Sequence, residues 1–212
     1  MKKYIALLLC LVLTLSLCAC GAKENLVGTW KTSINMAEML NTAMAEAGMG
    51  DYVQVESFEL PIIMELREDG TASLSVDAEG MAATADKLVE DMIPGLEKFL
   101  VDSVAAAGVE LSLEEILAAS GIASMEEFAG QLKDEFLAAG AFDEVAAEMK
   151  YKAKDGKLYF SDDLESDVVL GEYNTYKLEG DTLTLDVGNM EIDEEDEELA
   201  KYMFPMVLTR VK

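Results

Sequence analysis

Histidine is absent from this chain of 212 residues. Histidine is the side chain that most often serves as a general base near neutral pH, and it is also the commonest zinc ligand. The sequence also lacks the short motifs of a P-loop, a dinucleotide-binding turn, a serine nucleophile elbow and a calcium-binding loop. Carboxylates are so abundant that no pair stands out as acid and base, which leaves glycosidase-like chemistry as the only open enzymatic reading. We therefore expect a protein that is not an enzyme and that uses no metal or cofactor.

Cysteine is almost as scarce, since Cys10, Cys18 and Cys20 are the only three and all lie in the first 20 residues. Two lysines follow Met1, and residues 4–19 are then apolar or small throughout. This run of about 16 residues is shorter than the ~20 that cross a bilayer as a helix. The pattern is typical of a cleavable export signal.

The end of this run, Leu17-Cys18-Ala19-Cys20, resembles the lipobox of bacterial lipoproteins. In that motif a branched apolar residue and two small residues precede the cysteine whose sulfur takes a diacylglycerol. The resemblance implies a signal peptide over 1–19, lipidation of Cys20, and a short tether over 20–25. It also implies a location on the extracytoplasmic face of a bacterial cell membrane, and we expect a host with a single membrane. An ordinary signal peptide that happens to contain cysteines is the alternative.

Basic residues are few: 16 lysines and arginines stand against 42 acidic residues, which gives a net charge of −26. Nucleic acid and anionic lipid headgroups are repelled by such a chain. A basic protein or a cation remains as a partner, and solubility alone is the other explanation of the acidity. With 51% hydrophobic residues, the chain is too apolar to be disordered.

Alternation of apolar and polar residues predicts eight strands. In residues 58–67 the pattern places Phe58, Leu60, Ile62, Met64 and Leu66 on one face, while Pro61 on the other face suggests an edge or a bulge. Two hairpins are predicted at Asp155-Gly156 and at Gly180-Asp181, because such residues supply the positive φ of a tight turn. The strands are expected at 26–32, 58–67, 72–77, on both sides of the turns within 149–160 and 172–187, and at 204–211.

Helices are predicted in the interruptions between strands. Pro94 and Gly95 should split the long apolar pattern that begins at Met81 into two helices. "SLEE" at Ser112 and "SMEE" at Ser124 are capping boxes, in which the serine and the following glutamate satisfy each other's backbone amides. Further helical segments are expected at 34–47 and 141–148, and the acidic run 191–203 should be a solvated loop or a short helix.

The connections between the predicted strands alternate between tight turns and long segments. In an antiparallel meander such connections lie at opposite ends, so every long segment should gather at one end. Eight strands of this kind close into a barrel and leave no edge. We predict an α+β fold in which one domain, 26–212, is an eight-stranded antiparallel barrel with a helical insertion at about 81–148. An open antiparallel sheet packed against a separate helical subdomain is the alternative.

Gly28-x-Trp30 in the first strand and Arg210 in the last resemble the lipocalin and fatty-acid-binding-protein superfamily, the calycins. In that superfamily the tryptophan packs beneath a basic residue of the final strand and closes the barrel floor. A cation over an indole ring contributes ~0.5 to 2 kcal/mol. The helical insertion after the third strand is longer than lipocalins carry there, so the openness of the mouth is not implied by the resemblance.

The expected function is that of a membrane-anchored, non-catalytic binding module. In one hypothesis a small hydrophobic ligand occupies the barrel under a helical lid. In another, the same side chains fill a solid core, and the acidic helical cap binds or inhibits a basic protein or peptide. The residues expected to line a ligand are Leu60, Ile62, Met64, Leu74, Val76, Tyr176, Leu183 and Leu185.

Overall fold

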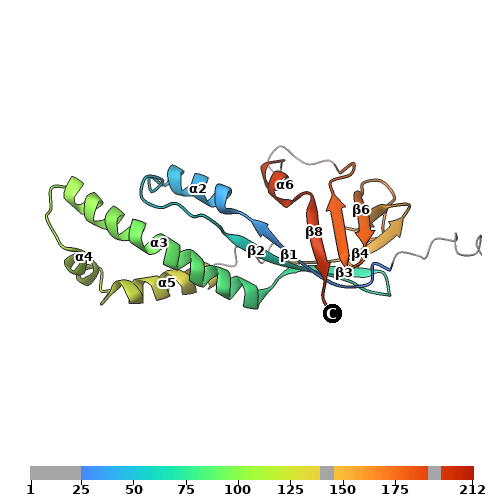
Figure 1. Ribbon diagram of the computed structural model, residues 1–212, viewed down its shortest axis with the longest axis horizontal. Coiled ribbons are helices and arrows are strands. Elements are labelled where there is room, and N and C mark those ends of the chain that lie inside the picture. The colour runs from blue at the N-terminus through green and yellow to red at the C-terminus, as the bar shows by residue number, and fades with distance from the viewer. Residues whose placement is uncertain (1–24, 139–145, 191–196) are drawn as a thin grey trace, which may run out of the picture.

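A closed barrel of eight antiparallel strands, paired in the order of the sequence, forms the body of the protein in the computed structural model (Figure 1). The structure describes residues 25–138, 146–190 and 197–212, so the predicted signal peptide and Cys20 lie outside the described residues. The predicted fold class is confirmed. The strands are β1 (Gly28–Asn35), β2 (Glu59–Leu66), β3 (Thr71–Val76), β4 (Ala147–Lys154), β5 (Lys157–Phe160), β6 (Asn174–Glu179), β7 (Thr182–Asp186) and β8 (Met206–Arg210).

The strands are joined to different extents around the ring. β1 and β2 pair along their whole length, from Gly28–Leu66 to Asn35–Glu59. In contrast, two residue pairs join β1 to β8, and two join β5 to β6. The barrel therefore has two narrow seams, one where the ring closes and one between β5 and β6.

The alternation in β2 is confirmed, because the inward-facing positions from Phe58 to Leu66 are all buried. The expected edge at Pro61 is wrong, since β2 lies between β1 and β3 in a closed ring. Pro61 lies just beyond the last β2–β3 pair, Ile62–Val76. Its carbonyl still accepts a hydrogen bond from the Asp77 amide at 2.9 Å, so the proline is accommodated where the pairing ends.

Four long connections leave the barrel at the same end, as the meander predicts. One of them projects sideways as an arm of three helices, while α6 lies above β8 and the C-terminus lies at the opposite end (Figure 1). We call these ends the mouth and the floor. The helices are α2 (Ala37–Glu46), α3 (Ala78–Ala106), α4 (Leu113–Ala119), α5 (Met125–Ala138) and α6 (Glu197–Met203).

α3 runs unbroken through Pro94, so the predicted split into two helices is wrong. Met92 and Leu96, on either side of the proline, are buried in the main core and hold the helix together. Gly95 lies against the segment before β2, where a Cβ atom would be 2.2 Å from the carbonyl oxygen of Tyr52. Tertiary packing therefore outweighs the hydrogen bond that proline removes.

The helix boundaries differ from the prediction in two places. α2 begins at Ala37, because residues 34–35 extend β1 and pair with β2. The predicted helical turn over 141–148 is wrong where it is described, since β4 already begins at Ala147. The residues before 146 lie outside the described part of that segment.

Of the two capping boxes, the first is complete. The Ser112 hydroxyl accepts from the Glu115 amide at 3.3 Å, and the Glu115 carboxylate accepts from the Ser112 amide at 2.9 Å. In the second, Ser124 accepts from the Glu127 amide at 3.2 Å, but the Glu127 carboxylate accepts from the Ala123 amide instead. The predicted reciprocal box at Ser124 is therefore wrong, because the Glu127 carboxylate binds the amide one residue before Ser124.

The helical arm and the barrel share one hydrophobic core, which rules out the alternative of a separate helical subdomain. Phe58, which precedes β2, meets Phe136 of α5 edge to face with ring centroids 5.8 Å apart. Tyr52 meets Phe99 of α3 in the same way at 5.4 Å. The buried residues on the inner face of α3 are Met81, Ala85, Leu88, Val89, Met92 and Leu96.

Candidate ligand-binding cavity

The barrel floor is closed by Trp30 and Arg210, which the two strands bring into register. The guanidinium carbon of Arg210 lies 4.1 Å from the centroid of the Trp30 ring. The same guanidinium donates to the carbonyl oxygens of Val27 at 2.5 Å and Asn25 at 2.6 Å. Trp30 is fully buried, and its indole N–H donates to the Leu26 carbonyl at 2.9 Å. The floor is thus closed by two side chains, Trp30 and Arg210, that both donate hydrogen bonds to backbone carbonyl oxygens.

Gly28 completes this floor because it has no side chain. Its φ of +144° is a conformation that other residues rarely adopt. A Cβ atom there would lie 2.6 Å from Nη1 of Arg210. The three residues of the sequence resemblance therefore meet at the floor, where their arrangement is structural.

A cavity of about 120 Å³ lies at the mouth end of the barrel. Of the residues expected to line a ligand, Met64, Leu74 and Leu185 form part of its wall. The others lie elsewhere in the same core: Leu60, Ile62 and Leu183 are buried, and Val76 and Tyr176 are half-buried and packed against them.

The rest of the cavity wall was not expected from the sequence. Met149 and Met206 point inward from strands by the same alternation as the expected residues, so that signal was available. Met203 is the last residue of α6 and lies outside every predicted strand. Phe204 falls inside the strand predicted at 204–211, but β8 begins only at Met206 in the structure. The wall residues that the sequence analysis missed are Ala72, Ser73, Met149, Phe160, Asn174, Met203, Phe204 and Met206.

One buried polar side chain, Asn174 at the start of β6, lies in this wall. Its Nδ2 atom donates to the Asp186 carbonyl on β7 at 3.2 Å. No charged residue is among the lining residues. The other polar lining residue is Ser73, whose Oγ atom accepts a hydrogen bond from Arg67. The lining residues therefore offer mainly apolar contact with one amide and one hydroxyl, which suits binding.

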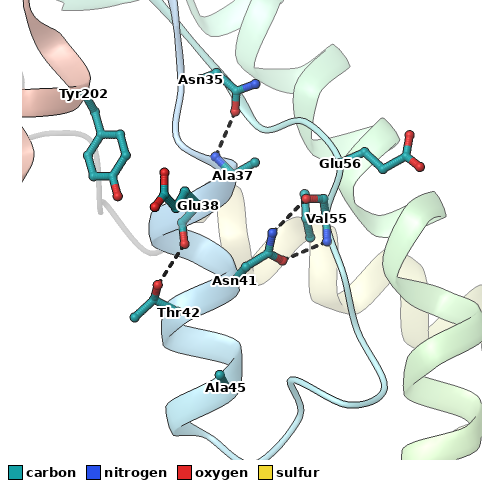
Figure 2. Close-up of a pocket in the computed structure, with 9 residues that line it drawn as sticks. All are labelled: Asn35, Ala37, Glu38, Asn41, Thr42, Ala45, Val55, Glu56 and Tyr202. Atoms are coloured by element: carbon teal, nitrogen blue, oxygen red, sulfur yellow. Dashed lines mark hydrogen bonds between the residues drawn. The ribbon is translucent and has the colours of Figure 1, made fainter.

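A larger and more open groove, of about 590 Å³, runs between α2 and Tyr202 (Figure 2). Glu38 and Glu56 lie at its sides and are both exposed. The amide of Asn41, which could have faced a ligand, instead binds the Val55 backbone through both its nitrogen (2.9 Å) and its oxygen (2.8 Å). The Asn41 amide therefore serves the fold, and the groove is an open surface feature flanked by two exposed carboxylates.

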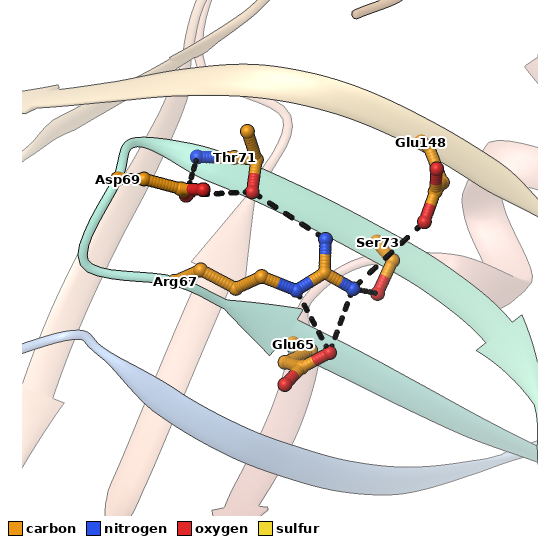
Figure 3. Close-up of polar contacts among 6 residues, drawn as sticks. All are labelled: Glu65, Arg67, Asp69, Thr71, Ser73 and Glu148. Carbon is orange, nitrogen blue, oxygen red and sulfur yellow. Dashed lines mark hydrogen bonds and ion pairs between the residues drawn. The ribbon is translucent and has the colours of Figure 1, made fainter.

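The densest polar cluster surrounds Arg67 on the outside of the β2–β3 hairpin (Figure 3). Arg67 donates to Glu65 at 2.7 and 3.0 Å and to Ser73 at 3.0 Å. The hydrogen bond to Glu65 raises the pKa of the guanidinium, and hydrogen bonds from Thr71 lower the pKa of Asp69. Because these groups satisfy one another, the cluster fixes the turn and offers no site.

Comparisons with models of known protein families, with curated proteins and with solved structures found no match. In the described part of the chain, no helix has the length and apolar character needed to cross a membrane. The described residues also contain no group of three or more acidic, cysteine or histidine side chains placed to hold a metal ion. The mouth cavity is thus the candidate site.

Proposed function

We propose that this protein is an extracytoplasmic lipoprotein, held on the membrane through Cys20, which binds a small hydrophobic ligand without catalysis. The observation that carries the proposal is the apolar cavity at the mouth of a barrel whose floor is sealed by Trp30 and Arg210. An engineered apolar cavity of ~150 Å³ binds benzene. A cavity of about 120 Å³ accordingly suits one small apolar group, or the end of a longer aliphatic chain.

The wall of the cavity favours adaptable apolar contact. Four of its residues are methionines: Met64, Met149, Met203 and Met206. Methionine has an unbranched, polarizable side chain that adjusts to the shape of its neighbour. Met203, the last residue of α6, and Phe204 complete the wall from outside the strands, so a bound ligand would contact the end of α6 as well as the barrel.

These methionines also provide the test. With ¹³C-methyl-labelled methionine, benzene should shift the NMR signals of the four wall residues. Met39, which is exposed, and Met92, which is buried in the arm, should not move and serve as internal controls. An absence of shifts at the wall, or equal shifts at Met92, would contradict the proposal.

A matched pair of variants localises the site. Leu74→Phe adds volume to the cavity wall and should abolish the benzene shifts. Val207→Phe adds the same type of side chain to the outer face of β8, where Val207 is 51% exposed, and should leave them unchanged. Loss of binding in both variants would indicate that the effect is not local.

The anchor is tested separately. Mass spectrometry of the protein extracted from membranes should find a diacylglycerol on an N-terminal Cys20. A Cys20→Ser variant should carry no diacylglycerol, and any of it whose leader is cleaved elsewhere should appear in the soluble fraction. An unmodified Cys20 in the membrane-extracted protein would overturn this part of the proposal.

A second function is favoured by the charge of the arm, residues 78–138, which contains thirteen acidic and three basic residues. Such a surface would steer a basic protein or peptide toward it, and the attraction would weaken with salt. A lysine-rich peptide should bind the protein more weakly after Glu90→Lys/Glu114→Lys in the arm than after Glu68→Lys/Asp162→Lys in the barrel. Equal weakening by both pairs would contradict a role for the arm.

A further inference from the structure

Asn174 and Ser161 are the two buried polar side chains among the described residues. The Ser161 hydroxyl is fully engaged, since it donates to the Asp163 carbonyl at 2.6 Å and accepts from the Lys150 amide at 2.8 Å. Asn174 is different. Its nitrogen donates to Asp186, but its Oδ1 atom has no hydrogen-bond partner among the described residues.

Asn174 lies in the cavity wall, and its unpartnered oxygen is not fully occluded. Within the described chain, no fully occluded side-chain nitrogen or oxygen lacks a partner, so this oxygen is within reach of a solvent-sized molecule. The side chain as a whole is only 6% exposed and lies in the cavity wall. An acceptor in this position is suited to a ligand group that donates a hydrogen bond.

The lack of charged residues in the cavity wall disfavours ligands with an ionised head group. Burying an ionised carboxylate or ammonium without a partner costs several kcal/mol. The cavity wall contains neither a cationic side chain for a carboxylate nor a carboxylate for an amine. In addition, the net charge of −26 repels anions from the whole molecule.

We infer that the cavity takes an uncharged aliphatic ligand whose head donates a hydrogen bond to Oδ1 of Asn174, as a primary alcohol or a primary amide does. This inference rests on the proposed function, because it assigns the chemical class of the ligand in the same cavity. The aliphatic tail of the ligand contacts the methionine side chains, and its head group donates a hydrogen bond to Asn174.

The test compares ligands of equal length on the full protein by the methionine-methyl NMR titration. 1-Hexanol should bind at least tenfold more tightly than hexanoate or hexylammonium at pH 7. Methyl pentyl ether has the same length but no donor, and it should bind roughly 2- to 12-fold more weakly than 1-hexanol, the range expected for one neutral hydrogen bond. Benzene serves as the reference without a head group.

A variant of the asparagine separates the head from the tail. Asn174→Leu should remove the preference for 1-hexanol over the ether and leave benzene binding in place. Thr175→Leu, on the exposed outer face of the same strand, is the matched control and should retain the preference. If Asn174→Leu fails to fold, the comparison of 1-hexanol with methyl pentyl ether on the unmodified protein still tests whether the ligand donates a hydrogen bond in the cavity.

The outcomes separate this inference from the proposed function. If hexanoate or the ether binds as tightly as 1-hexanol while benzene also binds, the inference is overturned and the hydrophobic cavity stands. Retention of the alcohol preference in Asn174→Leu has the same meaning. If neither benzene nor 1-hexanol binds, both fall together.

Discussion

At position 28 the barrel floor depends on the lack of a side chain. Arg210 reaches across Gly28 to bind backbone carbonyls on the far side, and its guanidinium lies over Trp30. Any larger residue at position 28 has to displace the arginine and also adopt a φ of +144°. The glycine therefore explains how Arg210 can pack against Trp30, which is 180 positions earlier in the sequence.

Gly28→Ala should lower the free energy of unfolding by about 1 to 3 kcal/mol, the cost of one strained backbone position. It should also shift the emission of Trp30 to longer wavelength, because the displaced arginine no longer covers the ring. Urea unfolding and fluorescence measure both effects. Gly108→Ala, where φ is also positive but no atom lies within 4 Å of the added Cβ, should leave the emission unchanged.

Asp77 forms an ion pair with Lys31 at 2.5 Å, which joins the first strand to the start of the helical arm. The hydrogen bond from Lys31 lowers the pKa of Asp77 below its usual value of 3.8. A carboxylate with a lowered pKa in the folded state stabilises that state above its unfolded pKa, and the stabilisation is lost as the pH falls through the folded value.

Asp77→Asn should therefore cost up to about 1 kcal/mol at pH 7, the range of an ion pair that is partly exposed. The difference from the unmodified protein should persist at pH 5 and shrink as the pH falls below 3.8. Urea unfolding at several pH values measures it. Asp162→Asn removes a similar charge from an exposed carboxylate and should stay within about 0.5 kcal/mol; a constant deficit for Asp77→Asn down to pH 2 would contradict the ion pair.

Among the helices, α3 shows where local and tertiary preferences disagree. Proline in a helix interior costs ~3 kcal/mol, yet the helix continues past Pro94 because Met92 and Leu96 are buried on its inner face. Gly95 adds close packing to the segment before β2. The pair of residues that predicts a break thus lies where the arm packs closely against the segment before β2.

Gly95→Ala should destabilise the protein despite the higher helix propensity of alanine, because its Cβ would lie 2.2 Å from the Tyr52 carbonyl oxygen. We expect a loss of about 1 to 3 kcal/mol, as for overpacking of a core. Gly130→Ala in α5 has open space around the added atom and should be neutral or stabilising by up to about 1 kcal/mol. Thermal unfolding of both variants distinguishes packing from propensity.

The strands could be predicted from the sequence because apolar and polar residues alternate along them with a period of two. Leu60, Ile62 and Met64 alternate with outward residues, and Gly156 marks its turn by composition alone. The contribution of α6 to the cavity wall could not be predicted, because Met203 reaches the mouth through the path that the chain takes before β8. Asn174 was missed for a related reason: a polar residue gives no apolar signal, and its burial becomes apparent only when the barrel closes around it.

For the whole molecule, charge is distributed unevenly. The arm has thirteen acidic and three basic residues, whereas the β4–β5 hairpin, 147–160, has four lysines and two acidic residues. Repulsion within the arm opposes folding, and salt screens it, since the Debye length falls from ~30 Å at 0.01 M to ~8 Å at 0.15 M. We therefore expect the stability of the fold to depend on ionic strength.

Raising NaCl from about 10 to about 150 mM should increase the Tm by about 2 to 4 °C, which corresponds to ~1 kcal/mol for a protein of this size. Differential scanning calorimetry measures the shift. At pH 4, where carboxylates are partly protonated, the same salt step should have a smaller effect. A Tm that is independent of salt at pH 7 would show that the arm is not under electrostatic stress.

The two narrow seams divide the ring into two groups of strands of unequal size, β1–β5 and β6–β8. Because two residue pairs hold each seam, slow amide exchange should be confined to the interior of each group, and the amides along the seams should exchange first. The β5–β6 seam ends at Leu158–Asn174, next to the cavity. Local opening of this seam would expose the cavity through the barrel wall, at a place separate from the mouth.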